Sequence, residues 1–244
     1  MIDQFSFQNL SFSFEGVYPI LTKSTFVFPA NQNVLLDGAT GEGKSTILKL
    51  LAALILPQEG QVKINDLDIT DMSFEEFLPL RKRMGYTFDY AGLMANRTLW
   101  DNLILPLLYH NEITIDEAEA RVSDLMSRFG ILNKKDQRPA AVSGGMRKAC
   151  VVLRAFVMNP EAVFLDDPFV GLSRENCTQL VRLINEHRER HGLKHVFLTT
   201  SDEAPLASLT YARVRIENQN LLTQNISSLN SDQNLTHFAK VENL

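Results

Sequence analysis

Nine consecutive residues near the start of the chain restrict its possible folds more than any other stretch. They read Gly38-Ala39-Thr40-Gly41-Glu42-Gly43-Lys44-Ser45-Thr46 and fit G-x-x-x-x-G-K-[ST], the pattern of a phosphate-binding loop, or P-loop. The apolar run 34–36 before the loop predicts a buried strand, and the run 47–54 after it predicts a helix. Strand, loop and helix in this order are the setting that the pattern requires, which disfavours a chance glycine-rich turn.

The residue types of this loop explain how it can hold a phosphate. Its three glycines allow backbone dihedral angles that a side chain forbids, so the backbone can wrap closely around the anion. The first amides of the following helix add a partial positive charge. Lys44 can reach the β- and γ-phosphates, and the Ser45 hydroxyl can bind Mg²⁺.

Length and composition limit the remaining possibilities. The chain has 244 residues, of which 45% are hydrophobic, enough for one large α/β domain or two small ones. Its net charge of −5 gives no strongly basic surface, so we expect no nucleic-acid partner. Cys150 and Cys177 lack metal-ligand spacing and lie in helical patterns, so we expect packing residues in a reducing compartment.

Neither a signal peptide nor a membrane span is expected from the sequence. Residues 1–4 do not have the character of a signal peptide, and the longest apolar runs are too short and too interrupted for a bilayer. We therefore expect a soluble protein, so that any role at a membrane needs a partner that spans it.

Strand and helix patterns alternate along the chain. Strands are predicted at 5–14, 25–28, 34–36, 61–64, 84–88, 162–167 and 196–200, with a hairpin at 212–222. Helices are predicted at 47–54, 73–83, 114–129, 143–159 and 174–190. This order predicts a mostly parallel sheet, with a helical insert and with nucleotide at the carboxyl ends of its strands.

The helix predicted at 114–129 has the clearest amphipathic pattern in the helical insert. Its apolar side comprises Ile115, Ala118, Val122, Leu125, Met126 and Phe129.

Four elements in sequence order point to a family. They are the loop 38–46, the segment Phe88-Asp89, Ser143-Gly144-Gly145-Met146, and Phe164-Leu165-Asp166-Asp167. Together they resemble the ATPase subunits of ABC (ATP-binding cassette) transporters, and the resemblance covers residues 5–222. It implies an α/β P-loop NTPase fold, in which a mostly parallel sheet is joined by an antiparallel β subdomain and an inserted helical subdomain.

The resemblance also implies a division of the chain. Residues 1–244 form a single cassette domain, whose nucleotide-binding core comprises 1–88 and 161–222. The helical subdomain spans 89–160, and 223–244 form a tail.

ATP and Mg²⁺ are the cofactors that the resemblance implies. Asp166 ends an apolar strand and would hold Mg²⁺ through water, together with Ser45 and Asp89. Phe14 matches the aromatic residue that stacks on adenine. Phe12 is a second candidate for that role, and an ordinary core phenylalanine is the alternative for both.

Family members pair head to tail, with each ATP between one P-loop and the other subunit's Ser-Gly-Gly segment. Ser143, Gly144 and Gly145 would therefore contact the ATP of a second cassette, at a predicted helix start that suits an anion. A simple helix cap is the alternative reading of these three residues.

Four positions depart from the family pattern. Asp167 stands where a Glu normally orients or deprotonates the attacking water, and Asp89 stands where a Gln is usual. Thr200 replaces the His that contacts the γ-phosphate, and Ser173 replaces an Asp that links the two sites. Groups that bind ATP are kept, whereas groups that position water and sense the γ-phosphate are altered.

These departures predict a catalytic set of Asp167, Thr200 and Asp89 that works slowly. The shorter Asp167 carboxylate falls back by roughly 1–1.5 Å, and a displacement near 1 Å can cost ~10²-fold in rate. Thr200 can donate one hydrogen bond but carries no positive charge. We therefore predict Mg²⁺-dependent ATP binding with weakened hydrolysis; sequence drift in a still-active enzyme is the alternative.

The resemblance implies partners and a location as well. They are a second cassette, identical or different, and integral membrane subunits, with this chain on the cytoplasmic side of the inner membrane. The segments Ser-Gly-Gly-Met-Arg (143–147) and Asp-Pro-Phe-Val-Gly (167–171) look most like the ATPases of Mce-type lipid transporters. Residues 97–102 also look like lipoprotein-release and cell-division cassettes.

Two other functions compete with energy coupling. One is a regulatory or structural cassette that holds ATP and hydrolyses almost none. The other is a soluble cassette that acts on DNA or ribosomes, which the sequence disfavours because such proteins usually carry two cassettes or a long coiled-coil insert.

Overall fold

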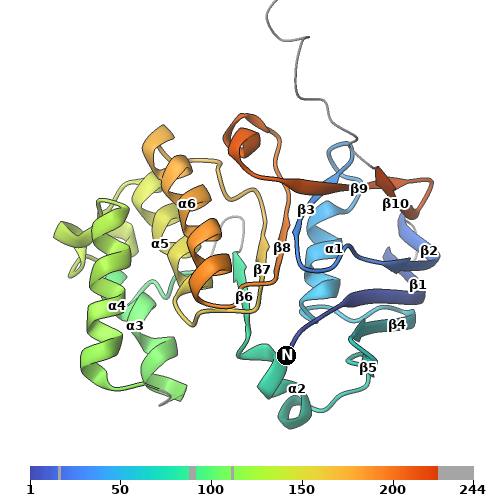
Figure 1. The fold of residues 1–244 in the computed structure, drawn as a ribbon, viewed down its shortest axis with the longest axis horizontal. Coiled ribbons are helices and arrows are strands. Elements are labelled where there is room, and N and C mark those ends of the chain that lie inside the picture. The colour runs from blue at the N-terminus through green and yellow to red at the C-terminus, as the bar shows by residue number, and fades with distance from the viewer. Residues whose placement is uncertain (16–17, 88–91, 111–112, 225–244) are drawn as a thin grey trace, which may run out of the picture.

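Two β-sheets and a group of helices form the layers of this protein (Figure 1). The structure, a computed structural model, describes residues 1–15, 18–87, 92–110 and 113–224. The larger sheet has six strands. In spatial order they are β10 (Asn220–Gln224), β9 (Tyr211–Glu217), β3 (Asn33–Asp37), β8 (His195–Leu198), β7 (Ala162–Leu165) and β6 (Met84–Thr87). Strands β9 to β6 run parallel, and β10 pairs antiparallel at the edge, which confirms the mostly parallel sheet.

The smaller sheet is antiparallel throughout. Its spatial order is β2 (Tyr18–Val27), β1 (Phe5–Phe14), β4 (Glu59–Ile64) and β5 (Leu67–Asp68). Strand β2 begins earlier than the predicted 25–28, because its first half pairs with the end of β1, where Phe14 lies opposite Tyr18. This sheet is the antiparallel β subdomain that the sequence predicts.

Six α-helices and three short 3₁₀ turns complete the described chain. The helices are α1 (Lys44–Leu51), α2 (Phe74–Arg81), α3 (Leu99–His110), α4 (Ile115–Arg128), α5 (Gly144–Phe156) and α6 (Arg174–Arg190). The 3₁₀ turns are η1 (Leu132–Lys134), η2 (Pro139–Ala141) and η3 (Ala204–Ser208). Helices α3, α4 and α5 all lie between β6 and β7 in sequence, as an inserted helical region requires. The division of the chain at 88 and 161 stays a prediction.

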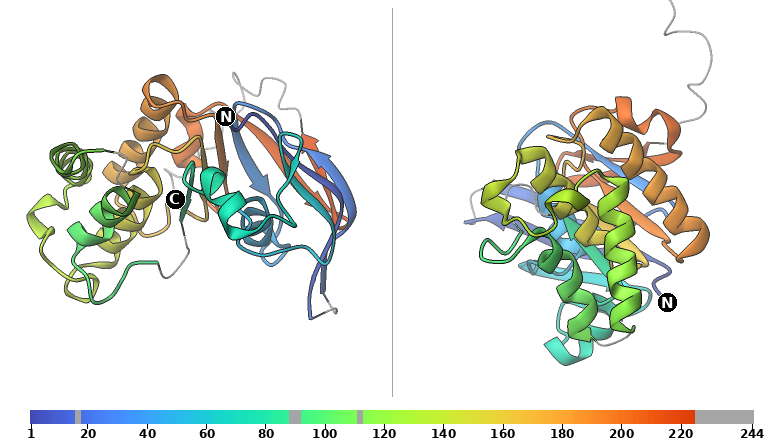
Figure 2. Two further views of the ribbon diagram at one scale, coloured as in Figure 1. Left: turned by 90° about the horizontal axis from the view of Figure 1, so that it is seen from below. Right: turned by 90° about the vertical axis from the view of Figure 1, so that its left-hand side faces the viewer.

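The four strands β3, β8, β7 and β6 of the larger sheet are buried on both faces, whereas β9 and β10 at its edge are partly exposed. Along β3, Leu35 packs into a core with α3 to α6, whereas Val34 and Leu36 pack into a second core with α1 and the smaller sheet. Successive strand residues point to opposite faces, so a strand covered on both sides has a continuous apolar sequence. Figure 2 shows the green and orange helices on one side of the molecule and the blue strands on the other.

Helix α4 matches its prediction except at one residue. Ala118, Val122, Leu125 and Met126 are buried, but Ile115 is 63% exposed, so its predicted place on the apolar side is wrong. The helix begins with a capping box in which Thr114 and Glu117 satisfy each other's backbone amides. Ile115 lies in this first turn, before the helix reaches the core.

Within the described residues, no helix is both long enough and apolar enough to cross a membrane.

Candidate nucleotide-binding site

The loop between β3 and α1 has the backbone that a phosphate cradle needs. Gly41 and Gly43 take φ angles of 89° and 96°, in the left-handed region that favours glycine. A Cβ at Gly43 would also overlap Ile20 of β2, so this position requires glycine twice over. Hydrogen bonding within α1 begins at the Ile47 amide, which donates to the Gly43 carbonyl. The amides of the preceding first turn are therefore the ones that a phosphate can take.

Side chains of the loop are arranged around its backbone. Lys44 Nζ donates to the carbonyls of Gly38 and Ala39 at 2.6 and 2.8 Å, so the ammonium lies over the loop. The Glu42 carboxylate accepts a hydrogen bond from the Ala39 amide at 2.6 Å and closes the turn. Ala39 and Thr40 are exposed, whereas the Thr46 side chain is only 5% exposed. Thr46 can thus offer a ligand its amide rather than its hydroxyl.

Asp166, directly after β7, joins this loop to the sheet. Its Oδ1 accepts hydrogen bonds from Ser45 Oγ at 2.9 Å and from Thr199 Oγ1 at 2.8 Å. Its backbone amide donates to Thr87 Oγ1. Sequence reasoning missed both threonines, although each follows or ends an apolar strand at the carboxyl edge of the sheet, where ligands bind.

A hydroxyl and a carboxylate in contact fit the chemistry of Mg²⁺. This cation takes oxygen ligands and usually combines one or two carboxylates with phosphate oxygens and water. Ser45 Oγ and Asp166 Oδ1 are the two protein oxygens placed to hold it beside the loop. Asp89, the third predicted ligand, lies outside the described residues, so its role stays a prediction.

Asp167, the predicted catalytic acid, occupies a restricted backbone position. Its φ is 41°, in the left-handed region that Asp tolerates better than most residues. Its amide donates to Thr199 Oγ1 at 2.9 Å, so the network around Asp166 also fixes Asp167. Within the part of the chain that the structure describes, the Asp167 carboxylate makes no hydrogen bond or ion pair.

Thr200, which was predicted to stand where the family's γ-phosphate-contacting His stands, is bonded to its own loop. Its hydroxyl donates to the Asp202 carbonyl at 2.8 Å and accepts from the Asp202 amide at 3.1 Å. A hydroxyl has a single proton, and here the Asp202 carbonyl receives it. The Asp202 carboxylate in turn accepts from the amide of Ala204, the first residue of η3, at 2.9 Å.

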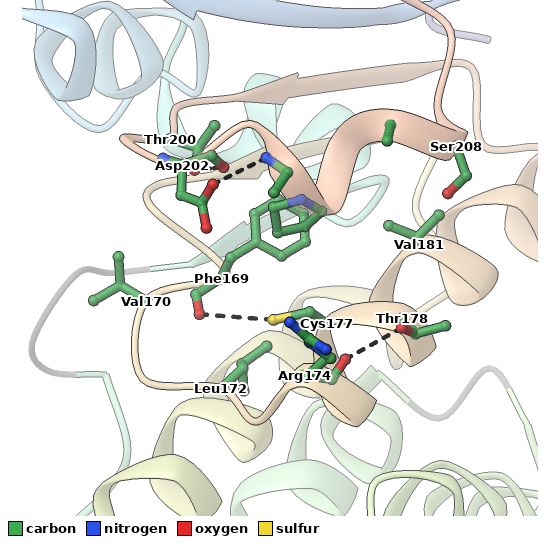
Figure 3. A pocket seen from close by; sticks show the side chains of 13 residues that line it. Phe169, Val170, Leu172, Arg174, Cys177, Thr178, Val181, Thr200, Asp202 and Ser208 are labelled. Atoms are coloured by element: carbon green, nitrogen blue, oxygen red, sulfur yellow. Dashed lines mark hydrogen bonds between the residues drawn. The ribbon is translucent and has the colours of Figure 1, made fainter. Parts of the chain in front are cut away.

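A cleft of about 750 Å³ borders Thr200 (Figure 3). It lies between the loop after β7, helix α6 and η3, and its lining includes Phe169, Leu172, Cys177 and Asp202. Cys177 faces this cleft, and burial raises the pKa of its thiol. Cys150 is buried in α5, and burial raises the pKa of its thiol to about 12. The described positions of both cysteines agree with packing roles.

The two candidates for adenine stacking differ in exposure. Phe14 is 49% exposed, whereas Phe12 is 8% exposed and belongs to the core. Their rings meet edge to face, with centroids 5.2 Å apart. Only Phe14 presents a face to a ligand, so the structure favours it over Phe12.

The Ser143-Gly144-Gly145 segment begins α5, as predicted. Ser143 is the N-cap, and its hydroxyl accepts from the Met146 amide at 3.3 Å. A separate hollow of about 360 Å³ is lined by Ser143, Gly145 and Met146 but by no residue of the P-loop. Ser173, the cap of α6, also lines it. The hollow that this segment lines therefore does not include the chain's own P-loop.

A family model described as "ABC transporter" matches residues 21–170, more than half of the chain. The chain belongs to the ABC transporter family. The methionine import ATP-binding protein MetN 1 of Acinetobacter baylyi is 32% identical over 173 residues, which are 70% of this chain and 48% of that protein. MetN of Escherichia coli strain K12 is 31% identical over 70% of this chain and 50% of its own length. This chain thus spans about half the length of these relatives.

Solved structures agree on the fold. The dimeric post-hydrolysis state of the ATP-binding cassette MJ0796, bound to ADP and Pi, superposes with a TM-score of 0.79 at 20% identity and covers 90% of this chain and 97% of that one. The structure of cbiO1 from Clostridium perfringens, part of the ABC transporter complex cbiONQ, has a TM-score of 0.72 at 20% identity. The match covers 91% of this chain and 88% of that one. The resemblance to the ABC family is therefore confirmed. The methionine-import relatives give no support to the Mce-type assignment.

Proposed function

We propose that this chain is the ATP-binding subunit of an ABC transporter and that its own site binds Mg–ATP but hydrolyses it slowly. Binding is supported by the glycine backbone of residues 38–46, by Lys44 over the loop, and by the contact between Ser45 and Asp166. Bound Mg²⁺ would neutralise phosphate charge, while the amides of the loop and Lys44 hold the phosphates.

Slow hydrolysis rests on one observation above all. The single hydroxyl proton of Thr200 is donated to Asp202, so it is not available to the γ-phosphate unless that bond breaks. The Asp167 carboxylate is free to act on water but is one methylene shorter than the usual Glu. General-base catalysis contributes ~10²–10⁴-fold to a rate, so its partial loss reduces activity without abolishing it.

Pairing with a second cassette follows from the position of Ser143. This residue lines a hollow that no P-loop residue lines, which supports a role at the ATP of a partner cassette. The MJ0796 cassette, which shares the fold, is described as dimeric. In a pair with a fully equipped cassette, one site would be impaired and one competent; in a pair of identical chains, both would be impaired.

Membrane subunits would complete the transporter, with this chain on the cytoplasmic side of the inner membrane. Those subunits choose the cargo. A lipid cargo is our proposal from residues 143–147 and 167–171 alone, and relatives named for methionine import do not support it. A regulatory cassette that holds ATP without turnover is the second candidate. It is favoured by the Thr200 hydroxyl, which already donates its hydrogen bond to the Asp202 carbonyl.

Restoring the missing groups tests the proposal. The double substitution Asp167→Glu with Thr200→His should raise steady-state ATP turnover by at least ~10-fold, while ATP affinity stays within about twofold, because only groups at the γ-phosphate change. Adding Lys44→Ala to the double variant should remove the rise in ATP turnover. Such a loss would show that the added turnover arises at this P-loop. No rise in turnover, with ATP still bound, would overturn the weakened-site proposal.

A further inference from the structure

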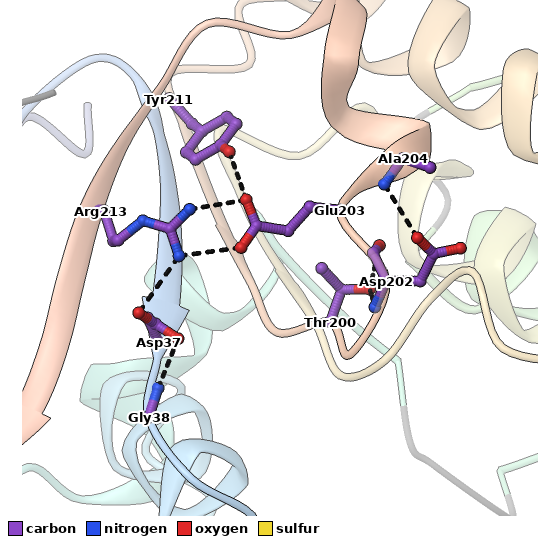
Figure 4. A network of polar contacts seen from close by, with 8 residues as sticks. All are labelled: Asp37, Gly38, Thr200, Asp202, Glu203, Ala204, Tyr211 and Arg213. Carbon is purple, nitrogen blue, oxygen red and sulfur yellow. Dashed lines mark hydrogen bonds and ion pairs between the residues drawn. The ribbon is translucent and has the colours of Figure 1, made fainter. Parts of the chain in front are cut away.

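An ion-pair bridge connects the loop that carries Thr200 to the strand that leads into the P-loop (Figure 4). Arg213, on β9, donates to both oxygens of Glu203 at 2.9 and 2.6 Å. The same guanidinium lies 3.2 Å from Asp37 Oδ2. One arginine therefore holds two carboxylates from different segments, one at the end of β3 and one in the loop after Thr200.

Each end of the bridge acts on backbone that borders the site. Asp37 Oδ1 accepts from the amide of Gly38, the first residue of the P-loop, at 2.8 Å. Glu203 comes three residues after Thr200, in the turn that the Thr200 and Asp202 side chains close. A shift of Arg213 would therefore reach both the P-loop and the Thr200 loop.

The centre of the bridge is well fixed. Arg213 lies on β9, which pairs with every residue of β3, and the Arg213 side chain is only 17% exposed. The Tyr211 hydroxyl also donates to Glu203, at 2.8 Å. Hydrogen bonding to Arg213 lowers the pKa of the Glu203 carboxyl, so the pair stays charged. The two parallel hydrogen bonds between the planar guanidinium and the carboxylate fix the orientation of Glu203 as well as its distance from Arg213.

Stability alone does not explain such a bridge. Glu203 is 44% exposed, and ion pairs near the surface contribute little to stability. The bridge instead connects the P-loop strand to the Thr200 loop, the two segments that would meet the phosphates of a bound nucleotide. It does so in a chain that has Thr200 where the family pattern has a histidine.

We propose that Arg213 is a positioning residue, which through Glu203 and Asp37 sets the Thr200 loop against the P-loop for the γ-phosphate. This role rests on the proposed ATP-binding function. ADP has no γ-phosphate and makes no contact that depends on the Thr200 loop, so its binding should depend on the bridge much less than ATP binding does. A purely structural ion pair would instead affect both nucleotides equally.

The test compares equilibrium binding of Mg–ATP and Mg–ADP to the full chain carrying Arg213→Gln. ATP affinity should fall about tenfold, the size expected for the loss of a charge-assisted hydrogen bond, and ADP affinity should change less than about twofold. Arg213→Lys keeps the positive charge but loses the planar guanidinium that donates to both Glu203 oxygens. Its ATP affinity should therefore lie between those of the unaltered chain and Arg213→Gln.

Arg188→Gln is the matched control. Arg188 is half-buried and binds Asn33 at the opposite end of β3, away from the nucleotide. This variant should keep the ratio of ATP to ADP affinity of the unaltered chain. If Arg213→Gln does not fold, Glu203→Gln removes the same charge pair and is measured in the same way.

The possible outcomes distinguish a failure of the proposed positioning role of Arg213 from a failure of the proposed ATP-binding function. An unaltered chain that binds ATP, with an ATP-to-ADP ratio unchanged in the Arg213 and Glu203 variants, overturns the positioning role alone. An unaltered chain that binds neither nucleotide overturns the proposed function and the positioning role together.

Discussion

Asp166 shows how one residue determines the local arrangement of the site. Its side chain is buried, and its Oδ1 receives two hydroxyl donors, Ser45 and Thr199, from segments far apart in the sequence. A buried carboxylate is costly unless it is paired with hydrogen-bond donors. The same groups that satisfy the charge therefore hold the start of α1 and the end of β8 together.

Thr199→Val tests this arrangement, because valine keeps the shape and removes the hydroxyl. The change leaves Asp166 without one donor and the Asp167 amide without its acceptor. We expect a loss of about 1–3 kcal/mol in the free energy of unfolding, measured by urea denaturation. Thr178→Val, where an exposed hydroxyl bonds its own helix, should change stability by less than half as much. Equal losses in the two variants would contradict this role of Thr199.

Sequence reasoning reached the residues whose roles follow from local spacing. Lys44, Ser45 and Asp166 were predicted because each belongs to a motif or ends an apolar strand. Thr199 and Arg213 were not, because their roles depend on partners far away in sequence: Thr199 Oγ1 bonds a residue 33 positions away. The choice between Phe12 and Phe14 as the adenine-stacking residue depends on how exposed each side chain is, which only the folded structure shows.

Helices and strands were predicted with correct bounds where burial produces a continuous apolar pattern in the sequence. Helix α6 was predicted at 174–190 and spans Arg174–Arg190, and the final hairpin was found at β9 and β10. Helix α1 begins at Lys44 rather than at 47, because its first turn is polar and serves the P-loop. The two-residue strand β5 is too short to leave a pattern at all.

Helix α2 was predicted at 73–83 and spans Phe74–Arg81, yet none of its residues is buried. Its ends are defined locally instead, by a capping box between Ser73 and Glu76. Phe77 and Leu80 only pack partly against the core beside α1. A pattern of apolar residues predicts that a helix forms, but how deeply it packs depends on the neighbours that the fold provides.

For the whole molecule, two buried histidines make stability depend on pH. Burial lowers the pKa of His187 and of His195 to about 4, below the ordinary value of 6.5. The folded state therefore binds fewer protons than the unfolded chain between these values, and stability is lost as the pH falls through this window. The loss is about 3 kcal/mol per histidine by pH 4.

Denaturation at several pH values between 8 and 5 checks this expectation. The free energy of unfolding should be nearly constant above pH 7 and should fall below 6.5. His195→Phe, which keeps a ring against Phe5 and Phe197, should reduce the slope by about half, because one of two histidines is removed. A slope that stays the same in this variant would show that His195 does not contribute.

The central claim is that residues 38–46 hold a nucleoside triphosphate that the chain cleaves slowly. Equilibrium binding of labelled ATP to the unaltered chain and to Lys44→Ala, with Mg²⁺ present and absent, tests it most directly. We predict saturable, Mg²⁺-dependent binding to the unaltered chain. Affinity should fall at least ~10-fold without the Lys44 ammonium, which we expect to contact the phosphates. A Lys44→Ala protein that holds ATP as tightly as the unaltered chain would contradict the claim.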